Sequence, residues 1–530
     1  MDTKALRQKI LDLAIRGKLV PQDPNDEPAE VLLERIREQK QQMFKEGKLK
    51  KKDIKNDTII FKGEDNLHYE KFQDGTVKCI EDEIPFEVPE GWAWCKLNDI
   101  YNFIDYRGAT PTKITNGIPL VTAKNVKSGY IDYTIDDYIS EEEFKERQQR
   151  GISKKGDILF TTEAPLGNAA LADMEKFSAG QRLITFQQYG SKNELINYVM
   201  LMFILSDFFQ QQLYVNKTGS TVAGIKAAIL KTLWIPVPPY NEQLRISNTL
   251  KSAINLIDSI SKNKEILSTS ISNTKSKILD LAIRGKIVPQ DPNDEPASVL
   301  LERIRAEKEE LIKQGKIKRD KKESVIFKGD DNSYYERVGD IISNIDDEIP
   351  FELPQNWEWS RLQTICYPIT DGTHKTPTYS DSGYIFLSAK NITTGKINWN
   401  DIMYIPKSLH DELYSRVSPK MNDILLAKNG TTGVAAIVDR ECEFDIYVTL
   451  ALLRVVNNNI SSQYLLKIIA SDTIQDYFKS SLKGIGVPNL HLEHIRTTLI
   501  PIPPINEQNK IAERIYQYYS LLDSIVQNIE

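Results

Sequence analysis

Apolar residues recur at intervals of three and four between Asn241 and Ile283, a stretch that contains neither proline nor glycine. This spacing predicts a long amphipathic helix with a coiled-coil-like seam, roughly 65 Å long at about 1.5 Å per residue. We expect Gly285 to end the helix, and Pro289 and Pro292 to prevent it from resuming. The seam positions are Ile257, Ile260, Leu267, Ile271, Ile278 and Leu281.

A second helix is predicted from Pro296 to Ile312, with a twin at Pro28–Phe44. The basic runs Lys48–Lys52 and Lys316–Lys322 follow these helices. We expect both runs to be solvated, with contact to phosphate or to a partner as the alternative. The charged stretches after them are expected to be exposed linkers.

The chain contains a long internal repeat, and such a repeat decides how the fold is divided. The block KILDLAIRGKLVPQDPNDEPAEVLLERIR from Lys9 returns as KILDLAIRGKIVPQDPNDEPASVLLERIR from Lys277. EIPFEVPEGWAW returns as EIPFELPQNWEW, and IPVPPYNEQ returns as IPIPPINEQ, in the same order. The repeated blocks are therefore framework, and the divergent stretches between them are where the halves differ in role.

The two ends of the chain each carry part of the long helical unit. The segment before Glu530 matches its first part, and the segment after Met1 matches its last part. We expect the terminal segments to pack together as a second helical spacer antiparallel to the first, in a circular arrangement; two tandem domains on a flexible linker are the alternative. Cysteines introduced near the two ends should cross-link in a closed arrangement.

The divergent stretches predict mixed α/β modules with short strands. Gly117–Tyr133 and Gly383–Trp399 fit strands and hairpins, and Ile196–Tyr214 and Gln463–Leu482 fit helices. Both modules keep one skeleton of short motifs. These are RGATPT beside DGTHKTP, LVTAKNV beside FLSAKNI, GDILFTTEAPLG beside NDILLAKNGTTG, and a glycine loop at Thr218–Gly224 beside Lys483–Val487.

Composition adds few constraints. A chain of 530 residues predicts several domains, and a net charge of −6 shows no global sign of a nucleic-acid binder. The four cysteines are far apart, which indicates buried thiols in a reducing cytoplasm and neither disulfides nor zinc: Cys79, Cys95, Cys366 and Cys442. The N-terminus is charged and no apolar run approaches the roughly 18 residues of a membrane span, so we expect a soluble, unexported chain.

These motifs together resemble the specificity subunit of type I restriction-modification systems, over nearly the whole chain. The resemblance rests on ILDLAIRGKLVPQDPNDEPA, on IPxPPxNEQ opening a long helix, and on AKN and GDIL inside two divergent modules. It implies a bacterial or archaeal, cytoplasmic, non-catalytic subunit whose two target recognition domains each bind half of a bipartite site on double-stranded DNA. Two methyltransferase subunits, and through them motor-nuclease subunits, would join it. S-adenosylmethionine, ATP and Mg would be used by those subunits, with no cofactor or metal in this chain.

The expected fold class is α+β, with two mixed α/β recognition domains separated by two long antiparallel helical spacers in a pseudo-twofold, circular organisation. The expected boundaries are an N-terminal helical part at 1–45, a charged linker at 46–90, the first recognition domain at 91–234, the central helical spacer at 235–315, a charged linker at 316–355, the second recognition domain at 356–499 and the C-terminal helix at 500–530.

Candidate DNA contacts are polar residues in the loops, because Arg, Lys, Asn, Gln, Ser and Thr carry the donors and acceptors that distinguish bases in the major groove. In the first module they are Arg107, Thr110, Lys113, Lys124, Asn125, Arg182, Ser220 and Thr221. In the second they are Thr373, His374, Lys375, Thr376, Lys390, Asn391, Lys428, Asn429 and Lys483. Residues shared by both modules should contact phosphate or support the fold, so the AKN pairs have a structural alternative of equal weight. A lone histidine is more often a hydrogen-bonding loop residue than a metal ligand.

An enzymatic function finds little support. The VPPY sequence at Val237–Tyr240 resembles an amino-methyltransferase motif, but valine cannot accept the hydrogen bond that the first position of that motif makes. We interpret VPPY and its twin IPPI as strand-to-helix connectors. The remaining alternative is an adaptor whose modules bind protein, and a steep dependence of binding on salt would favour DNA.

Overall fold

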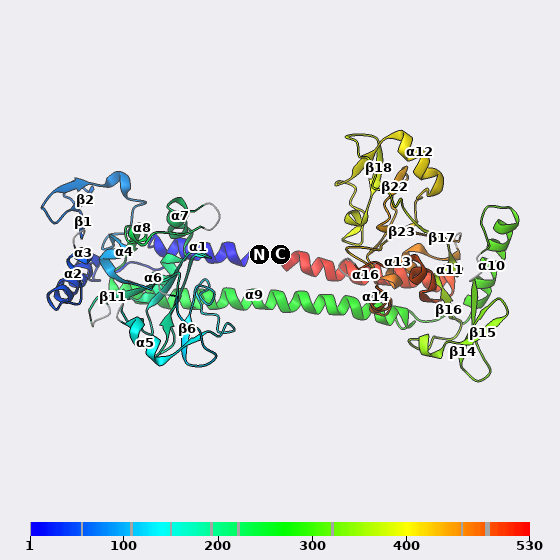
Figure 1. Cartoon of the computed structure of the whole chain (residues 1–530), viewed down its shortest axis with the longest axis horizontal. Helices are drawn as coiled ribbons and strands as arrows, with labels where there is room; N and C mark the ends of the chain where they lie inside the picture. The colour runs from blue at the N-terminus through cyan, green and yellow to red at the C-terminus, as the bar shows by residue number, and fades with distance from the viewer. Residues whose placement is uncertain are drawn as a thin grey trace. The chain divides into compact units, whose positions relative to one another are not determined.

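The computed structural model describes residues 2–54, 57–106, 110–148, 151–190, 194–219, 223–319, 323–456, 459–482 and 488–529. The chain divides into two compact units, Met1–Asn263 and Lys264–Glu530 (Figure 1). The long helix α9, Tyr240–Ile283, contains the division between them.

The first unit contains the elements before α9. They are α1 (Thr3–Ile15), α2 (Ala29–Lys45), α3 (Lys51–Ile54), β1 (Ile59–Lys62), β2 (His68–Lys71), β3 (Val77–Cys79), η1 (Glu81–Glu83), β4 (Ala93–Lys96), α4 (Leu97–Ile100), β5 (Tyr101–Asp105), β6 (Ile118–Val121), β7 (Tyr138–Ile139), α5 (Glu141–Arg147), β8 (Ile158–Thr162), β9 (Leu166–Leu171), β10 (Ser178–Ala179), β11 (Leu183–Gln188), α6 (Asn197–Ile204), α7 (Asp207–Val215), α8 (Ala227–Leu230) and β12 (Trp234–Val237).

The second unit repeats this order after α9. Its elements are α10 (Ala297–Lys313), β13 (Ser324–Lys328), β14 (Tyr334–Val338), β15 (Ile341–Asn344), η3 (Asp346–Glu348), β16 (Glu358–Arg361), α11 (Leu362–Ile365), β17 (Cys366–Asp371), β18 (Tyr384–Leu387), η4 (Ala389–Ile392), β19 (Met403–Ile405), α12 (Lys407–Arg416), β20 (Ile424–Ala427), β21 (Ala435–Ile437), β22 (Phe444–Ile446), β23 (Leu450–Val455), α13 (Ser462–Ile469), α14 (Asp472–Ser480), α15 (Leu492–Thr497), β24 (Leu499–Ile502) and α16 (Ile505–Ile529).

Each module is built on a four-stranded antiparallel sheet. The strand order is β5-β11-β8-β9 in the first module and β17-β23-β20-β21 in the second. A three-stranded sheet accompanies each, in the orders β10-β6-β7 and β19-β18-β22. The strands β8 and β20 are buried along their whole length, because helices cover one face and the smaller sheet the other. The predicted mixed α/β modules are confirmed.

A strand pair closes each module where it joins the framework. Strand β4 pairs with β12 in the first unit, and β16 pairs with β24 in the second. The prolines that follow lead directly into α9 and α16, so VPPY and IPPI are the strand-to-helix connectors that the sequence predicts. The long helix also ends as predicted, and Gly285 adopts a positive φ of 67° beyond it.

Each terminal helix packs antiparallel on the end of α9 that belongs to its own unit. In the first unit Arg7 forms an ion pair with Asp258, and Leu11 and Ile15 share a core with Ile246 and Leu250. In the second, Lys275 lies 2.5 Å from Asp523, and Tyr519 donates a hydrogen bond to the carbonyl of Lys275 at 3.0 Å. The joining of the two terminal helices to each other stays a prediction.

The sequence suggested that the charged stretches after α2 and α10 are exposed linkers, but both stretches also contain regular structure. Each contains a three-stranded antiparallel sheet, β1-β2-β3 and β13-β14-β15. Stacked rings join the first two strands in both, with centroids 5.8 Å apart for Phe61 and Tyr69 and 5.9 Å apart for Phe327 and Tyr335. Cross-strand aromatic pairs stabilise such hairpins even where charged residues dominate the composition. Cys79, which was expected to be buried, is exposed on the edge strand β3.

Candidate nucleic-acid interface

The four-stranded sheet of each module has one end to which the divergent loops lead. Because neighbouring strands are antiparallel, β5 and β8 end where β11 and β9 begin, and Asp105 pairs with Ile184 there. In the second module the same end lies where β17 and β20 finish, and Asp371 pairs with Ala451. We call this the loop end of the sheet.

Segments that are distant in the sequence meet at the loop end of the first module. The N–H of Thr162 donates to the carbonyl of Arg182 at 2.9 Å, and the N–H of Ile225 donates to the carbonyl of Thr162 at 3.0 Å. The N–H of Gly180 donates to the carbonyl of Val121 at 2.7 Å, which brings the turn after β6 close to these strands. These segments therefore contribute to one surface.

The second module repeats these backbone bonds with other side chains. The N–H of Lys428 donates to the carbonyl of Thr449 at 2.8 Å, and the N–H of Leu490 donates to the carbonyl of Lys428 at 2.9 Å. Lys428 therefore stands where the first module has Thr162. By the same bonds, Thr449 stands where the first module has Arg182.

Glu163 and Asn429 occupy the next equivalent position, and they form isolated bridges to Gly224 and Asn489. Arg182 Nε lies 2.9 Å from Glu163 Oε1, and these side chains are 54% and 42% exposed. The first module thus has an exposed charged pair at the loop end, where the second has a half-buried amide and a half-buried hydroxyl. The two loop ends have similar backbones and different chemistry.

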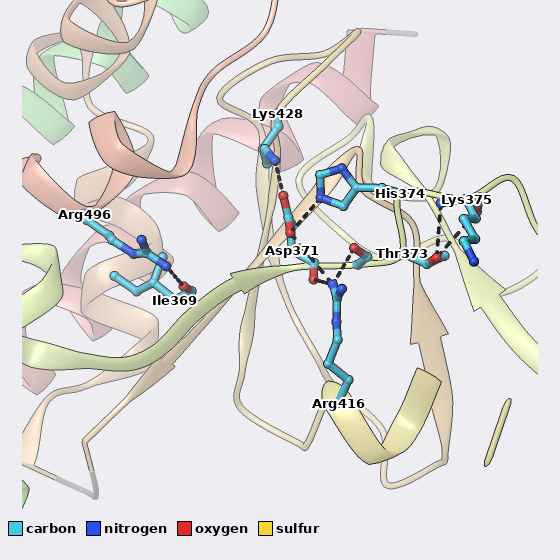
Figure 2. A network of polar contacts seen from close by, with 9 residues as sticks. Ile369, Asp371, Thr373, His374, Lys375, Arg416, Lys428 and Arg496 are labelled. Carbon is cyan, nitrogen blue, oxygen red and sulfur yellow. Dashed lines mark hydrogen bonds and ion pairs between the residues drawn. The ribbon is translucent and has the colours of Figure 1, made fainter. Parts of the chain in front are cut away.

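The loop after β17 is held at its start by Asp371 (Figure 2). Lys428 Nζ lies 2.5 Å from Asp371 Oδ2, and their side chains are only 5% and 10% exposed. His374 Nε2 lies 3.4 Å from Asp371 Oδ1, and Arg416 donates to the carbonyls of Asp371 and Gly372 at 2.7 Å each. Figure 2 shows Lys428, His374 and Arg416 reaching Asp371 from three directions. Asp371 thereby fixes the first residues of the loop.

Beyond this anchor the loop turns its polar groups outward. Thr373 is tied by its N–H to the carbonyl of Ile446 at 3.1 Å, whereas the His374 side chain is 68% exposed. Lys375 and Thr376 are exposed as well. Three of the four loop candidates in the second module are therefore available to a ligand.

The first-module candidates lie less close together. Thr110 is exposed and accepts a hydrogen bond from the side chain of Gln181, the neighbour of Arg182, so it belongs to the loop end. Lys113 is exposed but forms an ion pair with Asp137 at 2.6 Å, close to the smaller sheet.

The paired asparagines of the AKN motifs lie inside the modules. Asn125 accepts a hydrogen bond from the N–H of Thr122 at 3.0 Å, and Asn391 accepts one from the N–H of Ser388 at 2.9 Å. Both amides are buried and donate to backbone carbonyls of the following turn. The burial of both asparagines therefore favours the alternative interpretation, in which they close a turn, over the expected contact with bases. Lys124 and Lys390, one residue earlier, are exposed in both modules.

Lys428 was expected to contact DNA directly, but its ammonium group is buried against Asp371. It supports the loop instead. Asn429 is half-buried. The candidates Arg107, Ser220, Thr221 and Lys483 lie outside the described residues, as does the whole glycine loop at 483–487.

Comparison with known proteins agrees with this arrangement. The family model described as the type I restriction modification DNA specificity domain matches residues 89–268 and again residues 354–530. The chain belongs to this family. Specificity subunits are non-catalytic DNA-recognition proteins, as the sequence motifs indicated.

Relatives cover nearly the full length. The chain is 28% identical to the EcoAI specificity subunit of Escherichia coli, over 97% of this chain and 88% of that one. It is 27% identical to the EcoEI specificity subunit of the same species, over 99% and 91%. The chain also matches a solved structure whose description concerns complex assembly and conformational transition of the type I R-M system. The TM-score is 0.56 at 15% identity, over 84% of this chain and 94% of that one. This last likeness shows the fold alone.

Sequence reasoning missed Glu163, Thr449 and Arg416. Glu163 lies within the GDILFTTEAPLG motif, and Thr449 lies outside the recognised motifs. Only the pairing of the strands shows that both occupy the loop end. Arg416 ends helix α12, and nothing in the sequence indicates that it reaches the carbonyl of Asp371.

Two further observations concern the specificity subunit outside its modules. Ligand atoms of His68, Glu81 and Glu87 lie within 4.8 Å of one another, but His68 Nδ1 is already 2.8 Å from Glu81, and tyrosine replaces the histidine in the second copy. We interpret the group as support for the small sheet. Among the described residues, every helix is too short or too polar to span a membrane.

Proposed function

We propose that this specificity subunit recognises a bipartite sequence in double-stranded DNA, with the loop end of each module contacting one half-site. The observation that carries the proposal is the pair of loop ends, which share their backbone bonds and differ in side chains at equivalent positions. Such a difference is expected if one fold recognises two different base sequences.

Within this proposal, exposed residues that differ between the modules contact bases. These are Arg182 with Glu163 in the first module, and His374, Lys375 and Thr376 in the second. Arginine binds guanine with two hydrogen bonds, and carboxylates accept from cytosine. Lys124 and Lys390 are exposed in both modules and are assigned to phosphate, which is sequence-independent.

In this proposal the subunit determines which DNA sequence is bound, and other chains carry out the reactions on that DNA. Two methyltransferase subunits would dock on the framework, and motor-nuclease subunits would join through them. S-adenosylmethionine, ATP and Mg would be bound by those subunits. Because the two modules are covalently joined, binding of the second half-site is effectively intramolecular once the first is bound. Specificity for the DNA sequence is therefore higher than that of one module alone.

Methylome sequencing of a host that expresses this chain with its methyltransferase subunit tests the proposal. One bipartite methylated motif is expected. Exchange of residues 356–499 for the module of another specificity subunit should change one half of the motif and leave the other intact. A chimera that changes both halves, or binding that is insensitive to salt, would contradict the proposal.

A further inference from the structure

The carboxyl end of helix α7 lies beside the loop end of the first module. Gln210 donates from its side chain to the carbonyl of Gly167 at 3.0 Å, and Gly167 is the second residue of β9, which begins at the loop end. After the helix, Thr218 exchanges two backbone hydrogen bonds with Gly224, at 2.8 and 3.0 Å, and Gly224 bridges to Glu163. The last turn of α7 lies between these two contacts, so it belongs to the surface that the divergent loops form.

This last turn exposes two apolar side chains. Tyr214 is 68% exposed and Val215 is 81% exposed, although Leu213 before them is buried. Val215 is the last residue of the helix, and a β-branched valine is a weaker helix former than lysine, glutamine or glutamate. Neither packing nor helix propensity therefore accounts for a valine at this position.

The second module has the same helix in the same place. In α14, Gln475 donates to the carbonyl of Gly433 at 3.0 Å, as Gln210 does to Gly167. Each glutamine also donates to the carbonyl six residues before it, at 2.8 Å in α7 and 2.7 Å in α14. These matched bonds align the two helices residue by residue.

In this alignment the buried side of the last turn is kept and the exposed side has changed. The buried position is apolar in both modules, as Leu213 in α7 and Phe478 in α14. On the exposed side, Lys479 and Ser480 of α14 replace the tyrosine and the valine. At these positions only the first module exposes apolar atoms, and divergence of exposed side chains on a common backbone is also the pattern of the loop ends.

A positive charge lies against this apolar surface. Lys217 Nζ is 3.5 Å from the centroid of the Tyr214 ring, and Lys217 is itself exposed. A cation over an aromatic ring is attracted to it, which holds both side chains in place. Duplex DNA offers a counterpart to each part of the surface, because phosphates attract the lysine and the 5-methyl group of thymine is an apolar group in the major groove.

We propose that Tyr214 and Val215 contact the 5-methyl group of a thymine in the half-site bound by the first module, with Lys217 on a nearby phosphate. The inference rests on the proposed function and adds a base type to it. Hydrogen bonds from Arg182 and Glu163 would identify a G·C pair, whereas an apolar contact identifies thymine through its methyl group. The second module is polar at these positions and makes no such contact from α14.

The test measures DNA binding by the full-length chain together with its methyltransferase subunit. The duplex carries the methylated motif, and the first half-site is the half that exchange of residues 356–499 leaves intact. Each thymine, on either strand, is replaced in turn by deoxyuridine, which lacks the 5-methyl group and keeps every hydrogen-bonding group of the pair. One replacement in the first half-site should weaken binding about three- to fivefold, the effect expected for burial of a single methyl group.

The variant Tyr214→Lys/Val215→Ser copies the second module and removes the apolar surface. It should bind the thymine and deoxyuridine duplexes equally well, so that the ratio of the two affinities falls to about one. A variant that only disturbs the fold would weaken binding to both duplexes together and keep the wild-type ratio. Replacements in the second half-site should give the same ratios in the variant and the wild type.

Tyr130→Lys is the matched control. Tyr130 is a 62% exposed aromatic residue, and the AKN motifs align it with Lys396 of the second module. Its hairpin is bonded to the middle of β9, where the N–H of Gly129 donates to the carbonyl of Ala169 at 2.8 Å. This variant should keep the wild-type ratio of affinities.

Three results would overturn the inference and leave the proposed function intact. They are a first half-site without thymine, deoxyuridine replacements that never weaken binding there, and a wild-type ratio in the double variant. The lack of any bipartite methylated motif would overturn the proposed function and this inference together.

Discussion

Removal of the buried charge pair at the start of the loop after β17 provides the sharpest test of the structure. We consider Asp371→Asn, Lys428→Met and the combined variant. Asp371 and Lys428 lie 2.5 Å apart, and neither side chain is more than 10% exposed. The loss of one partner leaves the other as a buried charge without compensation, which typically costs about 3–5 kcal/mol.

The two single changes should not be equal. When Lys428 is removed, Asp371 retains His374 at 3.4 Å and Arg416 at 3.9 Å, both on exposed side chains that water can also reach. When Asp371 is neutralised, Lys428 has no other carboxylate among the contacts described for it. We therefore expect Lys428→Met to cost roughly 1–3 kcal/mol and Asp371→Asn roughly 3–5 kcal/mol. The combined variant should be less destabilised than Asp371→Asn alone.

The free energy of unfolding by urea, followed by a signal from the second unit, measures these differences. Lys390→Met is the control, because this exposed lysine should change stability by less than about 0.5 kcal/mol. Costs below about 1 kcal/mol for both single variants, or additive effects in the combined one, would show that the pair does not anchor the loop.

Other regions of the molecule give three further predictions. Burial raises the pKa of Asp157 to about 6 from 3.8, so the folded protein holds this proton where the unfolded chain has lost it. Its contribution to stability therefore falls as the pH rises from about 4 to 6, by at most about 3 kcal/mol, and stays low above that range. Gln187→Arg, which copies Arg454 beside Asp423, should remove this fall in thermal scans against pH; an unchanged pH profile would refute the assignment. Asn391→Ala should cost about 1–3 kcal/mol in urea unfolding, because it leaves the N–H of Ser388 without its acceptor, whereas Lys390→Ala should not. In DNA binding, Lys390→Ala should lower the slope of log K against log salt by about 1 and leave the methylated motif unchanged, while Arg182→Ala should relax the motif in one half-site only. A changed motif in Lys390→Ala would reassign that lysine to base contact.

The framework could be predicted from the sequence because its signals are local. The helices around Pro28 and Pro296, the long helix ending near Gly285 and the connectors at VPPY and IPPI all depend on spacing, prolines and glycines within a few residues. The sheets after α2 and α10 were missed for the opposite reason. Their strands are short and charged, and they are joined by aromatic pairs such as Phe61 and Tyr69.

The candidate site was predicted only in outline. Loops rich in Thr, Lys and Asn were recognised, but a motif does not show whether a side chain points outward. Lys428 and Asn391 have the residue types expected of DNA contacts, yet both are buried. The partner of Lys428 is Asp371, which is 57 residues away in the chain, whereas Asn391 closes its own turn through Ser388 and Asp401. Arg182 and Thr449 differ in type and become equivalent only when the strands are paired.

A close contact between a glycine and a proline occurs in both units, and it affects how this chain can change over time. Gly17 packs against Pro89 as Gly285 packs against Pro354, with nearly the same clearance. A recombinant in which one half's leading block precedes the other half's module would bring together surfaces of the same shape. Exchange of sequence between the halves would therefore introduce no steric clash at this contact, and a recombinant module would need no compensating change there.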